Sequence, residues 1–201
     1  MRSYIRQTID TYDAIASDYL EKWRDGAFES EWLHSFSDAL PRGAAVVDLG
    51  SGPGRDSAEL RRLGLNPICI DRSIEMLRAG ASEYANERVL GDITSLPVRD
   101  ASIFGIWANA SLLHLSPEEF ARGIAEIRRI LVTEGRLYLS LKEGIGSKRE
   151  TKQWGKPRWF QYWQASDLDE VLESCGFAIE KSGKEQTPND SWLVRLCALR
   201  N

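Results

Sequence analysis

Apolar runs of strand character alternate with amphipathic segments of helical period along most of the chain. The run AAVVDLG (44–50) precedes the helical segment RDSAELRRLG (55–64), and the run NPICID (66–71) precedes SIEMLRAGASEYA (73–85). Strands that alternate with helices of about ten residues form right-handed βαβ crossovers, which produce a mostly parallel sheet. We therefore expect an α/β fold, a Rossmann-like doubly wound sheet with helices on both faces.

The later part of the chain continues this pattern. Ser116 and Glu119 are spaced as the capping box of a helix that has Pro117 at its first position. A further helix, SDLDEVLESCG, is expected to be capped by Ser166 and closed by Gly176. Additional strands are expected at RVLGD (88–92), SIFGIWANA (102–110), GRLYLSLK (135–142), FAIEKSG (177–183) and SWLVRLCALR (191–200).

Two features break the alternation near the end of the chain. The last two expected strands have no helix between them, so they can pair as an antiparallel hairpin. The segment 143–165 is rich in Lys, Gly and Trp and is expected to be a polar loop.

Length and composition predict one cytoplasmic domain. A chain of 201 residues with 42% hydrophobic content can bury one core, so a single domain over 1–201 is expected. No run approaches the roughly 18 apolar residues of a membrane helix, and the start MRSYIRQTID is too polar for a signal peptide. The net charge of −4 does not favour nucleic acid as a partner. Cys69, Cys175 and Cys197 form no CxxC pair, which predicts neither a disulfide framework nor a metal site.

The stretch VVDLGSGPGRDS (46–57) places Gly50, Gly52 and Gly54 in the first strand-to-helix turn. In a doubly wound sheet, this turn is where the backbone approaches the ligand most closely. The spacing is GxGxG, and Arg55 stands where a dinucleotide fingerprint has its third glycine, so NAD or a flavin is not favoured. A Walker A loop is excluded because no GKS or GKT follows.

Two acids follow the next strands of the expected sheet. Asp71 ends the second strand, about 20 residues after the glycine loop, where a carboxylate can accept hydrogen bonds from both ribose hydroxyls. Asp92 follows the third strand and can accept from the exocyclic amine of adenine, with the backbone of Ile93 beside it. Because parallel strands end on one rim, these residues together predict a nucleoside site.

With these motifs in place, the sequence resembles a known family, the class I S-adenosylmethionine-dependent methyltransferases, and especially their small type 11 members. The resemblance extends from about Tyr12 to the last strand and implies a seven-stranded sheet with the last strand inserted antiparallel. It also implies S-adenosylmethionine as the cofactor. The motifs that carry it are VVDLGSGPGRDS, ICIDRSIEML, LGDITSLPVRDASIFGIWANASLLHL, EIRRILVTEGRLYLSLKEG and DLDEVLESCGF.

The resemblance assigns roles to individual residues. The glycine loop would hold the methionine moiety of the cofactor, and Asn109 would lie near the reacting methyl group. Residues 1–40 would form a helical cap over the cofactor site. The cofactor-binding residues that we expect are Tyr12, Tyr19, Asp48, Gly50, Ser51, Gly52, Gly54, Asp71, Arg72, Met76, Asp92, Ile93 and Asn109.

His114 is the candidate general base, because it follows the fourth strand on the acceptor side. Its alternative is a structural histidine bonded to nearby backbone. A base is needed only where the acceptor must lose a proton, because the sulfonium already carries a good leaving group.

The acceptor is expected to be a small apolar or aromatic molecule, methylated at oxygen or nitrogen. The fourth strand ends in ANAS, which lacks the proline-rich motif of enzymes that methylate exocyclic amines of bases. Large rings of the late loops favour an apolar acceptor pocket: Trp154, Trp159, Phe160, Tyr162, Trp163 and Trp192.

Two alternatives stay open. An RNA or protein methyltransferase would use the basic loop 148–158, which holds Lys148, Arg149, Lys152, Lys156 and Arg158. A non-catalytic nucleotide-binding subunit would keep the glycine loop but lack an open acceptor cavity beside it. The sequence does not identify the acceptor or the oligomeric state.

Overall fold

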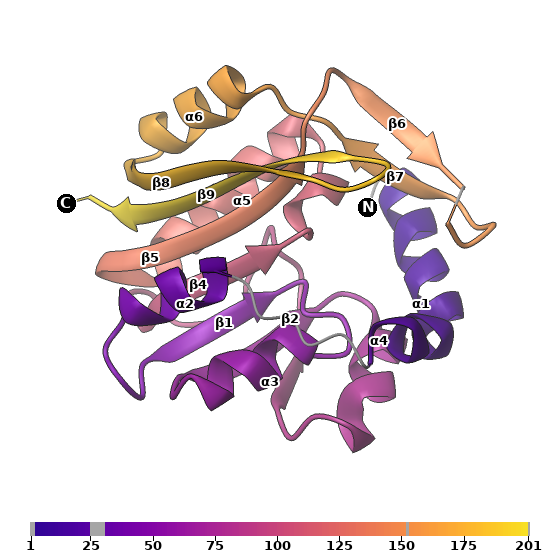
Figure 1. The fold of residues 1–201 in the computed structure, drawn as a ribbon, viewed down its shortest axis with the longest axis horizontal. Helices are drawn as coiled ribbons and strands as arrows, with labels where there is room; N and C mark the ends of the chain where they lie inside the picture. The colour runs from indigo at the N-terminus through magenta and orange to yellow at the C-terminus, as the bar shows by residue number, and fades with distance from the viewer. Residues whose placement is uncertain (1–2, 25–30, 152, 201) are drawn as a thin grey trace.

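The computed structural model describes residues 3–24, 31–151 and 153–200. A seven-stranded sheet with the order β3-β2-β1-β4-β5-β9-β8 crosses the molecule (Figure 1). Its strands are β1 (Ala45–Leu49), β2 (Asn66–Asp71), β3 (Glu87–Leu90), β4 (Ile103–Asn109), β5 (Leu131–Lys142), β8 (Phe177–Gln186) and β9 (Ser191–Leu199).

Strand pairing places the last strand inside the sheet. β1 to β5 pair with their neighbours in parallel, whereas β9 lies between β5 and β8 and is antiparallel to both. The expected α/β fold and the antiparallel insertion of the last strand are therefore confirmed.

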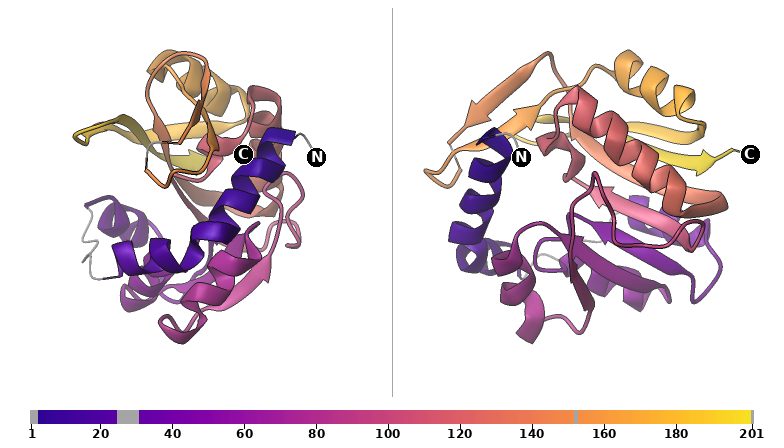
Figure 2. Two further views of the ribbon diagram at one scale, coloured as in Figure 1. Left: turned by 90° about the vertical axis from the view of Figure 1, so that its right-hand side faces the viewer. Right: turned by 180° about the vertical axis from the view of Figure 1, so that it is seen from behind.

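Helices pack on both faces of this sheet (Figure 2). Apolar side chains of α5 (Pro117–Ile130) and α6 (Ala165–Ser174) belong to the core of one face. Those of α2 (Glu31–Asp38) and α3 (Arg55–Arg62) belong to a second core on the other face. The short helix α4 (Ile74–Ala79) follows β2 and continues into the 3-10 turn η1 (Gly80–Ser82). The chain order thus builds the doubly wound arrangement.

The N-terminal helix α1 (Ser3–Trp23) lies apart from both helical layers, beside the edge of the sheet where the parallel strands end (Figures 1 and 2). It contacts α4 at one end and the strand β7 (Arg158–Gln161) at the other. The helical spacing of the apolar residues predicts a helix over residues 8–23, and the helix of the structure begins five residues earlier. Part of the expected cap, residues 25–30, lies outside the described residues.

The expected polar loop 143–165 contains a two-stranded hairpin, formed by β6 (Ser147–Glu150) and β7. The sequence does not predict this hairpin, because β6 reads SKRE and has no apolar alternation. This hairpin packs against α1 and the 3-10 turn η2 (Leu112–His114).

The two predicted helix starts have different outcomes. The capping box of α5 is confirmed: Ser116 Oγ accepts from the backbone N–H of Glu119 at 3.3 Å, and Glu119 Oε2 accepts from the N–H of Ser116 at 3.1 Å. The predicted cap Ser166 is wrong. Gln164 is the N-cap of α6 and makes no side-chain cap bond, while Ser166 lies in the first turn. Among the described helices, none combines the length and apolar character needed to cross a membrane.

Candidate active site

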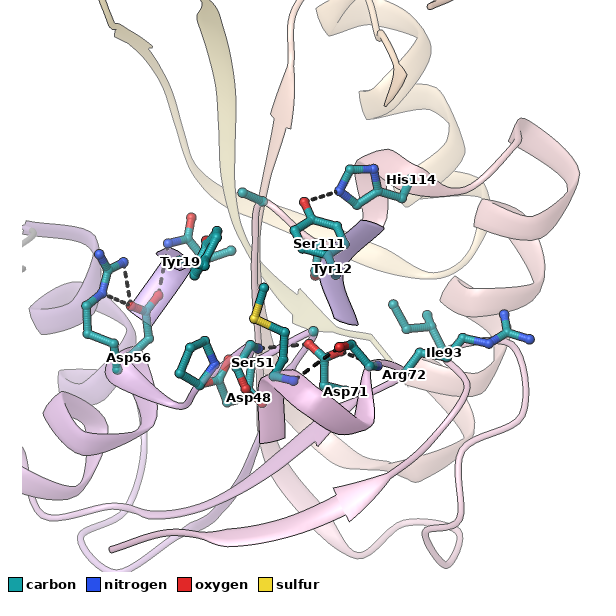
Figure 3. A pocket seen from close by; sticks show the side chains of 18 of the residues that line it. Tyr12, Tyr19, Asp48, Ser51, Asp56, Asp71, Arg72, Ile93, Ser111 and His114 are labelled. Carbon is teal, nitrogen blue, oxygen red and sulfur yellow. Dashed lines mark hydrogen bonds and ion pairs between the residues drawn. The ribbon is translucent and has the colours of Figure 1, made fainter. Parts of the chain in front are cut away.

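A cavity of about 410 Å³ lies at the rim where the parallel strands end (Figure 3). Its walls come from α1, from the turns after β1, β2, β3 and β4, and from the β8–β9 turn. The topological switch between β1 and β4 is part of this rim. The cavity therefore occupies the position where open α/β sheets bind ligands.

The three glycines of the first turn all adopt positive φ, with values of 73°, 55° and 95° for Gly50, Gly52 and Gly54. A Cβ at Gly50 would lie 2.3 Å from the Cβ of Ser111, so this glycine permits a close contact within the protein. A Cβ at Gly52 would meet nothing closer than Tyr19 Cε1 at 4.0 Å, and Gly52 lines the cavity. Bare backbone at Gly52 thus faces the ligand space.

Asp71 joins the turn after β1 to the turn after β2. Its Oδ2 accepts from the backbone N–H of Gly52 at 2.8 Å, and its Oδ1 accepts from the N–H of Ser73 at 2.7 Å. Burial raises the pKa of Asp71, although these backbone donors counteract the shift. The carboxylate also lines the cavity, and each oxygen has lone pairs for a ligand hydroxyl.

Asp92 is fixed by its own turn and by an arginine. Its Oδ1 accepts from the backbone N–H and the hydroxyl of Thr94, both at 2.9 Å. Its Oδ2 forms an ion pair with Arg72 Nη2 at 2.9 Å. Ile93 lines the cavity beside it (Figure 3). The predicted adenosine end of the site therefore brings together two acids, one arginine and one apolar side chain.

A buried polar network lies beneath the glycine loop. Asp48 Oδ2 accepts from Ser57 Oγ at 2.7 Å, and burial together with the charge of Asp56 raises the pKa of Asp48 to about 8. Asp56 Oδ2 accepts from Trp107 Nε1 and from Asn109 Nδ2, both at 2.9 Å.

Asn109 is the last residue of β4 and lines the cavity. Its Oδ1 accepts from Ser140 Oγ at 2.7 Å, while its Nδ2 donates to Asp56. The side-chain amide is thus held at both ends by the protein.

Tyr12 and His114 meet at the opposite wall of the cavity (Figure 3). His114 Nδ1 lies 2.5 Å from the backbone oxygen of Trp159, and its Nε2 lies 2.8 Å from the hydroxyl of Tyr12. Because a carbonyl oxygen only accepts, Nδ1 carries the proton and Nε2 accepts from Tyr12. Arg158 Nη1 in turn donates to the Tyr12 hydroxyl at 3.2 Å.

His114 is a weak base in this environment. The pKa of His114 is lowered to about 3, chiefly by burial and to a smaller extent by the cations Arg158 and Lys142, against the raising effect of the Trp159 carbonyl. The imidazole is therefore neutral at physiological pH, and its lone pair is used by Tyr12. The bond to backbone expected of a structural histidine is present.

The part of the cavity away from the strand-end acids has mostly apolar walls. Ile5 and Ile9 of α1 face it, as do Leu115 and Trp192, with Thr187 and Glu185 contributed by the β8–β9 region. These side chains come from three segments of the chain: α1, the residue that follows η2, and the β8–β9 hairpin.

Most of the rings expected at an acceptor pocket lie elsewhere. Of the six, Trp192 lines the cavity. Phe160 and Trp163 are buried in the core, and Trp154 packs against Tyr19 with ring centroids 5.9 Å apart. The place of Lys142 at the end of a strand predicts a solvated charge, but the structure buries it beside the Phe160 ring. It pairs there with Asp190 at 2.9 Å and Glu150 at 3.4 Å.

The structure gathers twelve of the thirteen predicted cofactor residues, and His114, at this one cavity; Gly54 lies just behind the loop as the N-cap of α3. Asp56, Ser111 and Ser140 also line the cavity but are not among the predicted residues. Asp56 directly follows Arg55 in the quoted motif, so its position beside the glycine loop was a usable signal. Ser111 and Ser140 had no such signal.

Comparison with known proteins identifies the domain. Residues 47–139 match the family described as "Methyltransferase domain" (Methyltransf_11). This segment runs from β1 to β5 and contains the glycine loop, both strand-end acids and His114. The predicted family resemblance is confirmed, and S-adenosylmethionine is borne out as its cofactor.

Individual relatives are more distant. The chain is 29% identical over 143 residues to a malonyl-[acyl-carrier protein] O-methyltransferase of Pseudescherichia vulneris, covering 70% of this chain and 51% of the relative. It is 31% identical over 112 residues to a demethylmenaquinone methyltransferase of Beutenbergia cavernae, covering 54% of this chain and 46% of the relative. The chain thus spans about half the length of these relatives.

A solved structure shares the fold. The 1,6-didemethyltoxoflavin-N1-methyltransferase of Burkholderia thailandensis, solved with 1,6-didemethyltoxoflavin and S-adenosylhomocysteine, aligns with a TM-score of 0.66 and 20% identity. The alignment covers 96% of this chain and 91% of that chain.

Proposed function

The chain is a class I S-adenosylmethionine-dependent methyltransferase of the type 11 kind, and from this premise we propose that it methylates a small, uncharged apolar or aromatic molecule at oxygen or nitrogen. We propose residues 1–201 as a single domain, with α1 serving as the cap over the cofactor.

The residues at the cavity fit the cofactor. The turn at Gly52 has no side chain toward the cavity, so backbone can approach the methionine moiety. Asp71 offers carboxylate oxygens to the ribose, and Asp92 with Ile93 offers an acceptor and an apolar surface to the adenine. Tyr12, Tyr19 and Met76 would cover the ligand from α1 and α4.

When bound, S-adenosylmethionine supplies an electrophilic methyl group on a sulfonium. The protein must then hold an acceptor in line with that methyl and exclude water. Ile5, Ile9 and Trp192 supply an apolar wall for this purpose. A general-base role for His114 stays a prediction; its geometry supports a positioning role, in which it fixes the Tyr12 hydroxyl on the cap helix.

Charge supports an acceptor without an anionic group. Besides Asp48, whose raised pKa of about 8 keeps it protonated near neutral pH, the carboxylates that line the cavity are those of Asp56, Asp71, Asp92 and Glu185. The two arginines that line it are already paired, Arg55 with Asp56 and Arg72 with Asp92. A substrate carboxylate would therefore meet a negative field without a free cation in the lining. A quinone ring, as named for the second relative, suits these walls better than a malonyl group, as named for the first.

The macromolecular alternative has less support. Of its five basic residues, Arg158 is buried and bonded to Tyr12, and Lys152 lies outside the described residues. Lys148, Arg149 and Lys156 remain exposed, which is a small patch for a nucleic acid backbone. The nucleotide-binding alternative lacks support because the cavity continues past the glycine loop into its apolar part.

That continuous cavity is the observation that carries the proposal. Calorimetry with S-adenosylhomocysteine, NAD and ATP tests the cofactor. We expect a heat of binding with S-adenosylhomocysteine and none with NAD or ATP. For the acceptor, the protein is incubated with S-[methyl-³H]adenosylmethionine and separate small-molecule, RNA and protein fractions of a cell extract. Label in the solvent-extractable small-molecule fraction is expected. Label confined to RNA or protein would contradict the proposed acceptor class, and NAD binding without S-adenosylhomocysteine binding would contradict the cofactor.

A further inference from the structure

Glu185 brings a carboxylate to the cavity that the protein itself does not pair. It lines the part of the cavity away from the adenosine acids, and among the described residues its carboxylate has no hydrogen bond or ion pair. The other carboxylates of the lining are bonded within the protein. Asp56 and Asp92 pair with arginines, and Asp71 accepts from two backbone N–H groups. Glu185 is therefore available to a ligand in a way that these acids are not.

Two cations close to Glu185 along the sheet are bonded to other acids. Lys184, the preceding residue, pairs with Glu143. Lys142, at the corresponding position of β5, pairs with Asp190 at 2.9 Å. Neither of them neutralises the charge of Glu185.

Strand register places Glu185 on the face of the sheet that carries the cavity. Glu185 of β8 is paired with Trp192 of β9, and Trp192 is paired with Lys142 of β5. Side chains of opposed residues share a face of the sheet, as do alternate side chains along one strand. Ser140, two residues before Lys142, is thus on the same face as Glu185 and Trp192, and all three line the cavity.

The charge of Glu185 acts inward across the sheet. The pKa of Tyr138 is raised chiefly by burial and next by the negative charge of Glu185. Tyr138 lies on β5, on the far side of β9 from Glu185 and two residues before Ser140. The carboxylate therefore adds negative potential over the strand ends where an acceptor would lie.

Glu185 and Trp192 together give this wall a hydrogen-bond acceptor beside an aromatic ring. An ionised carboxylate accepts hydrogen bonds but donates none, and it disfavours an anionic neighbour. Resting on the proposed function, we propose that Glu185 is a specificity-determining residue, whose carboxylate accepts a hydrogen bond from an O–H or N–H group of the methyl acceptor while the Trp192 ring packs against the acceptor's planar face. The acceptor class is thus narrowed to uncharged aromatic molecules that carry such a donor.

Two pairs of planar probes that differ in one donor test the proposal: naphthol with its methyl ether, and indole with N-methylindole. We expect wild-type protein saturated with S-adenosylhomocysteine to prefer the donor-bearing member of at least one pair by about fivefold or more. The bond is made to a charged group, although water competes at this exposed carboxylate. Equilibrium dialysis measures the affinity for each probe.

Glu185→Ala should reduce this preference to within about twofold, because the remaining walls of this part of the cavity are mostly apolar. The matched control is Glu173→Ala on α6, which removes the same charge from an exposed residue outside the cavity lining. We expect the control to keep the wild-type preference. Both variants should bind S-adenosylhomocysteine within about twofold of the wild type, which shows that each is folded.

Three results would overturn the inference alone in protein that binds S-adenosylhomocysteine: binding of none of the probes, no preference for the donor in either pair, or the same preference in Glu185→Ala as in the wild type. Wild-type protein that does not bind S-adenosylhomocysteine would instead overturn the proposed function with it.

Discussion

The two ends of the cavity are fixed in different ways. At the adenosine end, Asp71 bonds the N–H of Ser73 and Asp92 bonds that of Thr94, each two residues along the chain. At the opposite end, Tyr12 bonds His114 across 102 positions, and His114 bonds Trp159 across 45. The adenosine end is held by local turns and by contacts between successive strand ends, such as Asp71 to Gly52 across 19 positions. The opposite end is held by the packing of more distant segments.

This difference separates the residues expected to bind the ligand from the residues expected to hold the cavity wall in place. The local acids keep lone pairs directed to the cavity, so their loss should affect ligand affinity first. The long-range contacts join α1 and the β6–β7 hairpin to the sheet, so their loss should affect stability first.

Replacement of Asp71 should have the largest effect. Asp71→Ala removes an acceptor proposed for two ribose hydroxyls, at about 1.5–3 kcal/mol for each charged hydrogen bond. We expect S-adenosylhomocysteine to bind at least about 150-fold more weakly in calorimetry, with a native circular dichroism spectrum. The exposed Asp100→Ala is the control. If Asp71→Ala binds S-adenosylhomocysteine as tightly as the control does, Asp71 does not bind the ribose and has only a structural role.

Replacement of Lys142 should have the next largest effect, on the fold. Lys142 joins Glu150 of the hairpin and Asp190 of the β8–β9 turn while it is itself buried. Lys142→Met leaves both carboxylates without this cation, and we expect a loss of about 2–4 kcal/mol of unfolding free energy in urea titrations. The exposed Lys148→Met should change it by less than about 0.5 kcal/mol. If the two variants are equally stable, Lys142 does not contribute to the contacts that hold the hairpin and the β8–β9 turn together.

Replacement of His114 should change how stability depends on pH. The pKa of His114 is lowered by burial to about 3, whereas an unfolded histidine titrates near 6.5. The unfolded chain therefore binds more protons at this site between these values, and the contribution of His114 to wild-type stability should decrease as pH falls from 7 to 4. His114→Leu should melt lower at pH 7 and show a shallower decrease on acidification. His34→Leu, at the other, exposed histidine, is the control. A steep rise in turnover between pH 6 and 7 that His114→Leu abolishes would restore the general-base role.

Replacement of Asp48 should have the smallest effect and the opposite pH dependence. The pKa of Asp48 is raised to about 8 by burial and by Asp56, so the folded protein holds a proton that the unfolded chain releases. The contribution of Asp48 to wild-type stability should then decrease as pH rises from about 4 to 8, opposite in sign to that of His114. Asp48→Asn should flatten part of this decrease in thermal melts, whereas the exposed Asp10→Asn should not. A steeper decrease in Asp48→Asn would show that the carboxylate is charged in the folded state.

The same division explains what could be predicted from the sequence. The sheet, the capping box of α5 and the strand-end acids depend on patterns within a few residues, and sequence analysis located them. The neutral state of His114 depends on Tyr12 and on the carbonyl of Trp159, which no local pattern brings together.

The β6–β7 hairpin escaped prediction for the same reason. Its place is set by α1, where Thr11 Oγ1 donates to the carbonyl of Pro157 at 2.7 Å and Thr8 Oγ1 accepts from the N–H of Trp159 at 3.0 Å. Burial of Lys142 likewise depends on rings contributed by β7 and β9.

The order of the strands also determines what the margins of the sheet present to other chains. β3 is four residues long, and β8 is the long outer strand at the opposite margin. β8 carries Lys181, Lys184 and Glu185 and has an irregular register between Ile179 and Lys181. Charges and a bulge on an outer strand oppose the addition of a strand from another molecule. Protection against edge-to-edge aggregation is thus built into the strand that shields β9 from the outside.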